Sequence, residues 1–399
     1  MKIGKERIHN LPMNDVTSLG AYADRLQREA EARGQQLPPP VRLQIGEPDF
    51  RTPTHISQAA QESILNERLT YAPAAGWPWL RALLAEKVTR VNGYSVQAEH
   101  TAVALGGTGA LLAALTAIVG PGDEVLLPDP CWPLYMRQLA ACGATAVTYP
   151  LDPKSEWYPD IARLETLVTT RTKVLLINSP GNPTGAVFPR EIMQALLDFA
   201  CRHDLYLLSD ECYDQVVFEG EHISPATLLA KSEFENGRFI GVYTFSKTYA
   251  MTGWRIGYVV ASTRLIETIT AVLDASYTSI ATPVQRAAAA ALTGPQECAL
   301  EMCRAYQRRR DIAVSLLKDY GRYVYTPHGA FYTLIDVRGA HGLKGRQFAL
   351  DLLKERNVAV APGSGFGRVS DEYVRISLAG PEEEIARGVK EVCAFADRD

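Results

Sequence analysis

The amino-acid sequence predicts an α/β fold: a large domain with a mostly parallel seven-stranded sheet flanked by helices, plus a smaller α+β domain. Three observations predict it. At 399 residues the chain exceeds the size at which one hydrophobic core usually stops growing, so two domains are expected. Strand and helix patterns alternate between residues 101 and 261, which is typical of a doubly wound sheet. After Pro283 this alternation gives way to long helical patterns.

The residues before the alternating region predict helices joined by turns. Apolar side chains recur at helical spacing in three segments, and a short apolar segment follows three consecutive prolines. The predicted elements are helices over residues 16–33, 54–65 and 80–91 and a strand over residues 41–45.

The strands of the large sheet are predicted from short runs rich in β-branched and aromatic residues. They cover residues 101–105, 124–127, 146–149, 173–178, 205–209, 239–245 and 256–261. The gap between Lys247 and Arg255 is too short for the dozen or so residues of a parallel crossover. The strand over residues 256–261 is therefore expected to run antiparallel to its neighbours.

The C-terminal part of the chain predicts the smaller domain. Its expected elements are helices over residues 287–292 and 296–320 and strands over residues 333–337 and 373–377. We place the domain boundary near residue 295, so that residues 46–295 form the large domain. Residues 1–45 and 296–399 then form the small domain.

The composition excludes several functional classes. With 22% charged residues and a net charge of −4, the chain lacks the basic excess of a nucleic-acid-binding protein. No apolar run is long enough for a membrane span, so we expect a cytoplasmic protein without a membrane partner. The seven cysteines show no Cys-x-x-Cys spacing, which argues against a disulfide framework or a metal site.

Lys247 is the strongest candidate for a catalytic residue. It follows a predicted strand, and the hydroxyls of Thr244, Ser246 and Thr248 flank it. A lysine at the mouth of a sheet can lose solvation and become an amine nucleophile that forms a Schiff base with a carbonyl. Arg255 offers a fork of donors suited to a phosphate. A lone lysine is more often an ordinary loop residue, so this interpretation depends on the other motifs.

Two further motifs follow predicted strands. Gly106, Gly107 and Thr108 open an Ala/Leu-rich helix, where free backbone N–H groups and the helix dipole make an anion site. The run lacks the Gly-x-Gly-x-x-Gly spacing of a dinucleotide site. Trp132 is held between two prolines and presents a flat face on which a planar ring can stack. The alternative explanations are a merely tight turn and a core-filling tryptophan.

Polar side chains also follow the next two strands. Proline-stiffened turns hold Asn182, whose amide can donate to a phenolate or a carboxylate. Asp210 directly ends a buried strand, which is costly unless its carboxylate meets a cation such as a protonated ring nitrogen. Tyr213 would then reach the other edge of the same ring. Turn chemistry for Asn182 and helix capping for Asp210 are the alternatives.

All these groups lie at the C-terminal ends of predicted strands, where open α/β sheets bind their ligands. They comprise a phosphate cradle, a stacking face, a carboxylate for a ring nitrogen, donors for a phenolate, and an amine. Together they describe a receptor for pyridoxal 5′-phosphate.

The sequence resembles the class I and II aminotransferases, pyridoxal-phosphate enzymes of the aspartate aminotransferase fold, over nearly its whole length. Five runs carry the resemblance. They are Gly-Glu-Pro-Asp-Phe (46–50), Asn-Ser-Pro-Gly-Asn-Pro-Thr-Gly (178–185), Asp-Glu-x-Tyr (210–213), Ser-Lys-x-x-x-x-x-Gly-x-Arg-x-Gly (246–257) and Arg-Ile-Ser (375–377).

The resemblance implies a role for each candidate around the cofactor ring. Lys247 would form the Schiff base with the cofactor and shuttle a proton between Cα and C4′. Asp210 would keep the pyridine nitrogen protonated, so that the ring acts as an electron sink. Tyr213 and Asn182 would hydrogen-bond the ring oxygen, and Trp132 would stack on the ring.

The resemblance also implies phosphate and substrate contacts. The phosphate would be held by Gly106, Gly107, Thr108, Thr244 and Arg255. Arg375 would bind the substrate α-carboxylate as a bidentate pair, with Gly46, Trp132 and Asn182 beside it. Tyr71, which taken alone is a loop packing residue, would reach the phosphate of the neighbouring subunit. A homodimer with shared active sites is therefore expected.

The expected activity is transfer of an amino group from an L-amino acid to a 2-oxo acid such as 2-oxoglutarate or pyruvate. Many dicarboxylate-specific relatives carry a lysine after the paired glycines, where this chain has Thr108, so neutral or aromatic donors are expected over dicarboxylic ones. The alternative is a carbon–sulfur lyase or another pyridoxal-phosphate enzyme acting at Cα or Cβ. A regulatory protein is disfavoured, because the residues before Gly46 are too few for a DNA-binding module.

Overall fold

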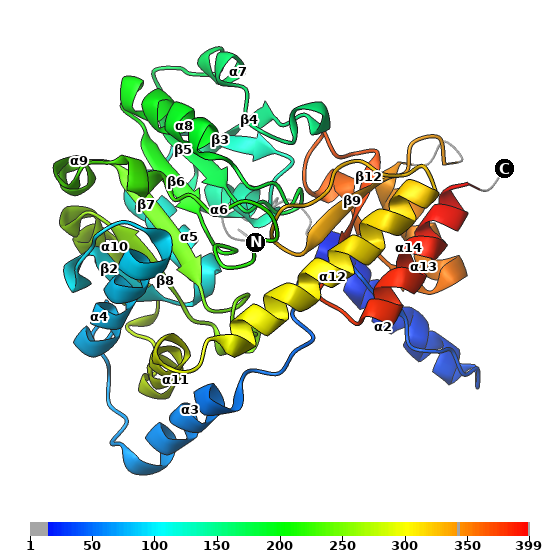
Figure 1. Cartoon of the computed structure of the whole chain (residues 1–399), viewed down its shortest axis with the longest axis horizontal. Coiled ribbons are helices and arrows are strands. Elements are labelled where there is room, and N and C mark those ends of the chain that lie inside the picture. The colour runs from blue at the N-terminus through cyan, green and yellow to red at the C-terminus, as the bar shows by residue number, and fades with distance from the viewer. Residues whose placement is uncertain (1–14, 341–343, 398–399) are drawn as a thin grey trace, which may run out of the picture.

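Figure 1 shows the computed structural model of the protein, which describes residues 15–340 and 344–397. Its largest feature is a seven-stranded sheet in the order β2-β8-β7-β6-β5-β3-β4. The strands are β2 (Thr101–Ala104), β3 (Glu124–Asp129), β4 (Thr145–Pro150), β5 (Thr172–Asn178), β6 (Tyr206–Asp210), β7 (Phe239–Thr244) and β8 (Gly257–Ala261). Strands β3 to β7 pair in parallel, whereas β8 is antiparallel to both β2 and β7. The prediction made from the short gap after Lys247 is confirmed.

Helices cover both faces of this sheet (Figure 1). The helices of this part of the chain are α3 (Thr54–Asn66), α4 (Pro78–Lys87), α5 (Gly106–Ile118), α6 (Leu134–Cys142), α7 (Ile161–Glu165), α8 (Arg190–Arg202), α9 (Lys231–Asn236), α10 (Thr263–Tyr277) and α11 (Thr282–Thr293). Of these, α3 packs on α11 rather than on the sheet. The mostly parallel, helix-flanked sheet is the architecture that the alternating pattern predicts.

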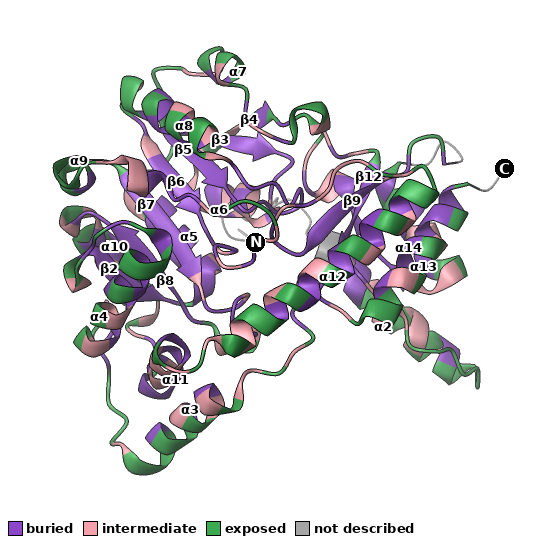
Figure 2. Ribbon diagram, in the orientation of Figure 1, coloured by how far each residue is buried: buried purple, intermediate pink, exposed green. Residues whose placement is uncertain are grey.

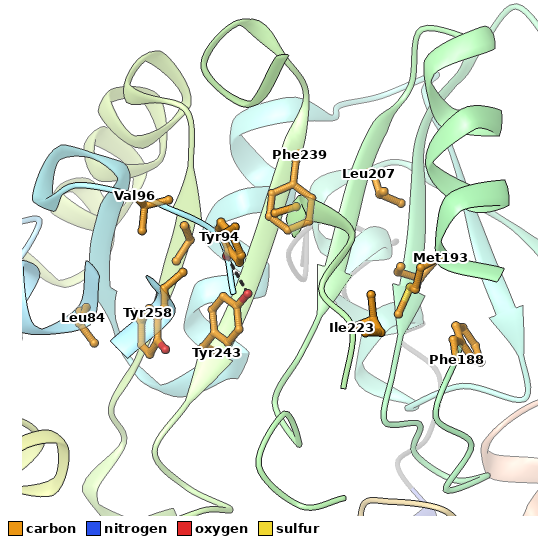
Figure 3. Close-up of a cluster of buried hydrophobic side chains, with 14 of the residues drawn as sticks. Leu84, Tyr94, Val96, Phe188, Met193, Leu207, Ile223, Phe239, Tyr243 and Tyr258 are labelled. Carbon is orange, nitrogen blue, oxygen red and sulfur yellow. Dashed lines mark hydrogen bonds between the residues drawn. The ribbon is translucent and has the colours of Figure 1, made fainter. Parts of the chain in front are cut away.

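Strand β5 shows how the two layers form. Its side chains alternate between the faces, because successive residues of a strand point in opposite directions. Val174 and Leu176 join a hydrophobic cluster with α5, α6 and α10, whereas Leu175 and Ile177 join another with α4, α8 and α11. Figure 2 shows the inner strands of the sheet buried, whereas the edge strand β4 is partly exposed. Figure 3 shows part of the second cluster. Burial on both faces explains the continuous apolar runs of the sequence.

A second, smaller group of elements packs around its own hydrophobic cluster, which includes Phe331, Phe348 and Val374. Strands β9 (Tyr332–Asp336), β11 (Ala361–Pro362) and β12 (Tyr373–Ser377) form an antiparallel sheet, and β1 (Val41–Arg42) pairs in parallel with β10 (Val358–Ala359). The helices are α2 (Asp15–Ala32), α12 (Glu297–Asp319), α13 (Gly345–Arg356) and α14 (Glu382–Ala396). None of the helices in the described ranges combines the length and apolar character needed to cross a bilayer.

Three predicted elements differ clearly from the structure. The helix expected over residues 287–292 begins five residues earlier, at Thr282. The other two differences involve contacts with distant segments. The strand expected over residues 41–45 stops at Arg42, and two residues later the Gln44 carbonyl accepts a hydrogen bond from the Arg375 guanidinium instead of a neighbouring strand.

The helix expected over residues 80–91 ends at Lys87 and continues as a π-helical turn to Asn92. In a π turn residues five apart face each other, and Lys87 Nζ donates to Asn92 Oδ1 at 2.8 Å. Both side chains also donate to the carboxylate of the distant Asp214, which favours this turn.

Candidate active site

A cavity of about 320 Å³ opens at the C-terminal ends of the parallel strands, where β9 and β12 approach the large sheet. It gathers all the predicted site residues except Gly106 and Tyr71. The predicted residues that line it are Gly46, Gly107, Thr108, Trp132, Asn182, Asp210, Tyr213, Thr244, Lys247, Arg255 and Arg375. They meet there because parallel strands deliver their following loops to one edge of the sheet.

Lys247 follows β7 and is half-buried. Its Nζ donates a hydrogen bond to the Gly46 carbonyl at 2.8 Å, and the rings of Tyr213 and Phe331 lie 6.0 and 5.7 Å from it. Within the described ranges no carboxylate forms an ion pair with this lysine. The amine thus meets the cavity with a single neutral acceptor, which suits a nucleophile. Of the flanking hydroxyls, Ser246 lines the cavity and Thr248 does not.

Asp210 ends β6 and is only 4% exposed. Its carboxylate accepts a hydrogen bond from the Tyr135 hydroxyl at 2.5 Å and another from the Cys212 backbone N–H at 3.1 Å. Burial raises the pKa of Asp210, while these hydrogen bonds oppose the shift. A buried carboxylate held only by neutral donors gains strongly from a cationic partner.

The start of α5 forms an anion cradle. Gly106 has a φ of +68°, and a Cβ there would lie 2.6 Å from Arg255 Nη2, so bare backbone is required. The first N–H groups of the helix have no partner within it. Across the same space, Thr244 Oγ1 donates to Ser246 Oγ at 3.0 Å. Free N–H groups, hydroxyls and a guanidinium around one space suit a phosphate.

Arg375 lies on β12 and is 3% exposed. Its Nη1 donates to Asn182 Oδ1 at 3.1 Å, its Nη2 donates to the Gln44 carbonyl, and its guanidinium lies 4.2 Å from the centre of the Tyr332 ring. Burial lowers the pKa of Arg375. No carboxylate pairs with it in the part of the chain that the structure describes. A buried guanidinium with only neutral partners is suited to a ligand carboxylate.

Comparison with known proteins identifies the family. Residues 38–392 match the family model described as aminotransferase class I and II. The chain is 40% identical to the aspartate/prephenate aminotransferase of Thermus thermophilus over 96% of each chain. It is 34% identical to an arginine–pyruvate transaminase of Pseudomonas aeruginosa, over 94% of this chain and 95% of that one. A Thermus thermophilus aspartate aminotransferase structure with maleate has a TM-score of 0.91 at 37% identity, covering 99% of this chain and all of that one.

The chain belongs to the class I and II aminotransferase family. The resemblance inferred from its motifs is confirmed, and so is the fold that the resemblance implies. Aminotransferases of this family depend on pyridoxal 5′-phosphate, so the protein is a pyridoxal-phosphate-dependent transaminase.

The cavity of this aminotransferase fits that cofactor in three places. The buried Asp210 carboxylate, which has no cation beside it among the described residues, fits a protonated ring nitrogen. The cradle at Gly106 and Arg255 fits the phosphate. The Lys247 amine fits the aldehyde.

The cavity residues of the aminotransferase that were not predicted as site residues from the sequence include Tyr135, Cys212 and Tyr332. Tyr135 contacts Asp210 across 75 residues of sequence, and Tyr332 contacts Tyr213 across 119. No local pattern could have paired them. Cys212 lies inside the Asp-Glu-x-Tyr run, where its position between two candidates was a usable signal.

Tyr71 lies outside its own chain's cavity. It is 86% exposed, on the loop between α3 and α4. Ile64, Leu65 and Leu69 near it are also exposed. The end of α3 and the loop after it therefore present exposed apolar side chains.

Proposed function

We propose that this aminotransferase moves the amino group of a neutral or aromatic L-amino acid to a 2-oxo acid such as 2-oxoglutarate or pyruvate. The distribution of positive charge in the cavity supports the choice of donor. Its cationic lining residues are Lys247, Arg255 and Arg375. The reaction uses each in a different place: as the amine, for the phosphate and for the α-carboxylate. None is left, among the described lining residues, for the side-chain carboxylate of an amino donor, and Thr108 is neutral. By the same argument, of the two acceptors pyruvate fits this lining better than the dicarboxylate 2-oxoglutarate.

We assign further predicted residues in and around the cavity to the cofactor. Trp132 packs edge-on against Tyr135, with ring centres 5.5 Å apart, and offers its face to the cofactor ring. Tyr213 and Asn182 donate to the ring oxygen, since Asn182 Oδ1 is already taken by Arg375 and its Nδ2 is left to donate. The phosphate is held by Gly106, Gly107, Thr108, Thr244 and Arg255.

The chemistry follows from these positions. When bound, the cofactor supplies a protonated ring that withdraws electrons from the substrate Cα. Arg375 holds the α-carboxylate through two donors and fixes the orientation of the amino acid. Lys247 Nζ then takes the proton from Cα as a general base and returns it during product formation. Asp210 stabilises the positive charge on the ring nitrogen throughout.

A donor screen tests the substrate class. With 2-oxoglutarate or pyruvate as acceptor, kcat/KM for phenylalanine, tyrosine and leucine should exceed that for aspartate and glutamate by about tenfold or more. A higher value for aspartate would refute the proposed donor preference. The holoenzyme mixed with an amino acid alone should convert the cofactor to its amino form, seen by absorbance. Release of ammonia and pyruvate without a 2-oxo acid would indicate a lyase instead.

We also propose a homodimer with shared active sites. The exposed apolar side chains at the end of α3 and on the loop that carries Tyr71 support it, because a second copy would cover them. Tyr71 would then reach the phosphate of the neighbouring subunit. Tyr71→Phe should weaken cofactor binding without changing the dimer, as measured by equilibrium dialysis and sedimentation. A monomer in sedimentation at micromolar concentration would contradict the shared site.

We propose a reducing, cytoplasmic location as well. All seven cysteines are free thiols in the structure. Free thiols in this number suit a reducing compartment. Cell fractionation with an antibody to the chain would test the location.

A further inference from the structure

Tyr332 is a cavity residue that the proposed reaction does not yet use. It begins β9 and is 2% exposed. Its hydroxyl lies 2.8 Å from the Tyr213 hydroxyl, and its ring lies 4.2 Å from the Arg375 guanidinium. The hydroxyl also lies against the backbone of Gly46, because a Cβ added at that position would be 1.8 Å from the hydroxyl oxygen. One side chain thus touches the proposed cofactor donor, the proposed substrate clamp and the segment that binds Lys247.

The direction of the hydrogen bond between the two tyrosines follows from proton counting. Each phenol has one proton to donate. If Tyr213 donates to the cofactor ring oxygen, it can only accept from Tyr332. Burial and the neighbouring Tyr332 hold the pKa of Tyr213 well above its usual value, so Tyr213 keeps its proton. A phenol that accepts one hydrogen bond donates the next more strongly.

The ring of Tyr332 has a separate contact. The Arg375 guanidinium lies between this ring, at 4.2 Å, and the Phe366 ring, at 4.8 Å. Aromatic faces at such distances stabilise a cation and limit its rotation. Of these two rings, only that of Tyr332 also carries a hydroxyl. The two functions of Tyr332 therefore belong to different atoms and can be separated by substitution.

We propose that Tyr332 is a positioning residue with two functions: its hydroxyl orients the Tyr213 donor toward the cofactor ring oxygen, and its ring orients Arg375 toward the substrate carboxylate. The inference rests on the proposed roles of Tyr213 and Arg375. Without the Tyr332 hydroxyl, Tyr213 donates less strongly and the ring oxygen keeps more negative charge. That charge holds a proton on the neighbouring lysine-bound nitrogen more tightly.

The test compares two variants as holoenzymes. The visible absorbance of the holoenzyme changes with pH as the lysine-bound nitrogen titrates, and the pH at the midpoint of that change is the quantity compared. In Tyr332→Phe this midpoint should rise by about 0.5 to 1 pH unit, which corresponds to the free energy of one neutral hydrogen bond. Its KM for the amino acid should stay within about twofold, because the ring remains. In Tyr332→Leu, the midpoint should rise similarly and KM should rise about fivefold or more.

Two controls make the comparison specific. Tyr94→Phe removes a hydroxyl from an equally buried tyrosine pair, Tyr94 and Tyr243, whose oxygens are 2.8 Å apart behind the sheet (Figure 3). Its midpoint should equal that of the wild type. Tyr213→Phe should raise the midpoint, and adding Tyr332→Phe to it should cause no further rise, because Tyr332 acts through Tyr213.

The outcomes separate two kinds of failure. A wild-type midpoint in Tyr332→Phe, or a double variant shifted beyond Tyr213→Phe, would overturn the hydroxyl function. An unchanged KM in Tyr332→Leu would overturn the ring function. An unchanged midpoint in Tyr213→Phe would refute the role of Tyr213 under the proposed function, and the hydroxyl function would fall with it.

Discussion

Buried charges occur in two regions of the molecule, and the core region pairs them with opposite charges. Behind the sheet, Lys87 forms an ion pair with Asp214, and Asn92 Nδ2 donates to the same carboxylate at 3.0 Å. On α12, Arg309 binds both oxygens of Asp49, at 2.9 and 2.8 Å. Such pairs are complete within the chain, and removal of one partner would leave the other uncompensated.

The cavity region gives its charges only neutral partners. Lys247 binds the carbonyl of Gly46, Arg375 binds an amide and a carbonyl oxygen, and Asp210 accepts from a hydroxyl and a backbone N–H. The fold satisfies the hydrogen bonds of these groups and leaves their charge to a ligand. Among the residues named above, charge pairing, more than burial, separates the structural ionisable groups from the proposed functional ones. Asp129 does not follow this division, because it is buried outside the cavity and, among the described residues, its carboxylate accepts only from the backbone N–H groups of Arg368 and Val369. Four predictions can break or sharpen the comparison.

The largest effect is expected from the two lysines. Lys247→Ala should lower turnover by about 10³-fold or more and abolish the absorbance of the lysine-bound cofactor, with its thermal unfolding unchanged. Lys87→Met should instead keep the turnover of the folded protein and lower the free energy of unfolding by about 3 kcal/mol, because Asp214 stays buried and unpaired. Steady-state rates and denaturant unfolding measure both. Wild-type transamination by Lys247→Ala would end the assignment of the catalytic amine.

The next effect concerns Asp210. Asp210→Asn should lower turnover by about 10²-fold, because the ring nitrogen loses its anionic partner. Burial raises the pKa of Asp210 in the folded protein, so its charged form opposes folding. As pH rises from about 3.9 through the folded value, the cofactor-free wild type should therefore lose stability relative to the variant. Denaturant unfolding between pH 4 and 8 measures this difference.

Asp214 is the matched carboxylate for Asp210, and its substitution is expected to affect stability more than turnover. Asp214→Asn should destabilise the protein at neutral pH, because it leaves Lys87 without its ion-pair partner. Turnover per folded molecule should be reduced far less than in Asp210→Asn. Equal effects of the two substitutions on unfolding would mean that pairing does not distinguish the regions.

A smaller effect is expected from the arginines. Arg375→Lys keeps the charge but loses the fork of donors, so KM for the amino acid should rise about tenfold with the fold intact. Arg309→Lys should lower the thermal midpoint and leave KM unchanged, since its two bonds go to Asp49. Parallel kinetics and melting curves test the pair. A KM unaffected by Arg375→Lys would remove the carboxylate clamp from the proposal.

The smallest effect is expected from Thr108, a neutral residue on the cavity wall. Thr108→Lys would add a cation to the cavity wall, and kcat/KM for aspartate should rise about fivefold relative to phenylalanine. Thr108→Val, which adds no charge, serves as the control. A ratio that does not change in Thr108→Lys would show that this wall does not contact the substrate side chain.

Cavity residues could be predicted from the sequence where a chemically distinctive side chain directly follows a predicted strand. Asp210 and Lys247 each follow an apolar strand run closely, so their position at one rim could be inferred from topology. Tyr135 and Tyr332 could not, because each acts through a contact with a distant segment. The π turn after Lys87 and the short strand at Arg42 also involve side chains from elsewhere in the chain, Asp214 and Arg375 respectively. Local patterns specify elements, whereas long-range contacts adjust where they end.

The hydrogen bond from Lys247 Nζ to the Gly46 carbonyl joins segments 201 residues apart. A lysine nitrogen that becomes covalently attached to another molecule gives up its ammonium donors, and this tie must open. The protein thus contains an internal competitor for its own nucleophile. A measured affinity for the aldehyde therefore reflects the bond to the aldehyde minus the hydrogen bond to the Gly46 carbonyl. Substitutions in residues 41–46 that weaken this hydrogen bond would raise the affinity for the aldehyde without contacting the aldehyde.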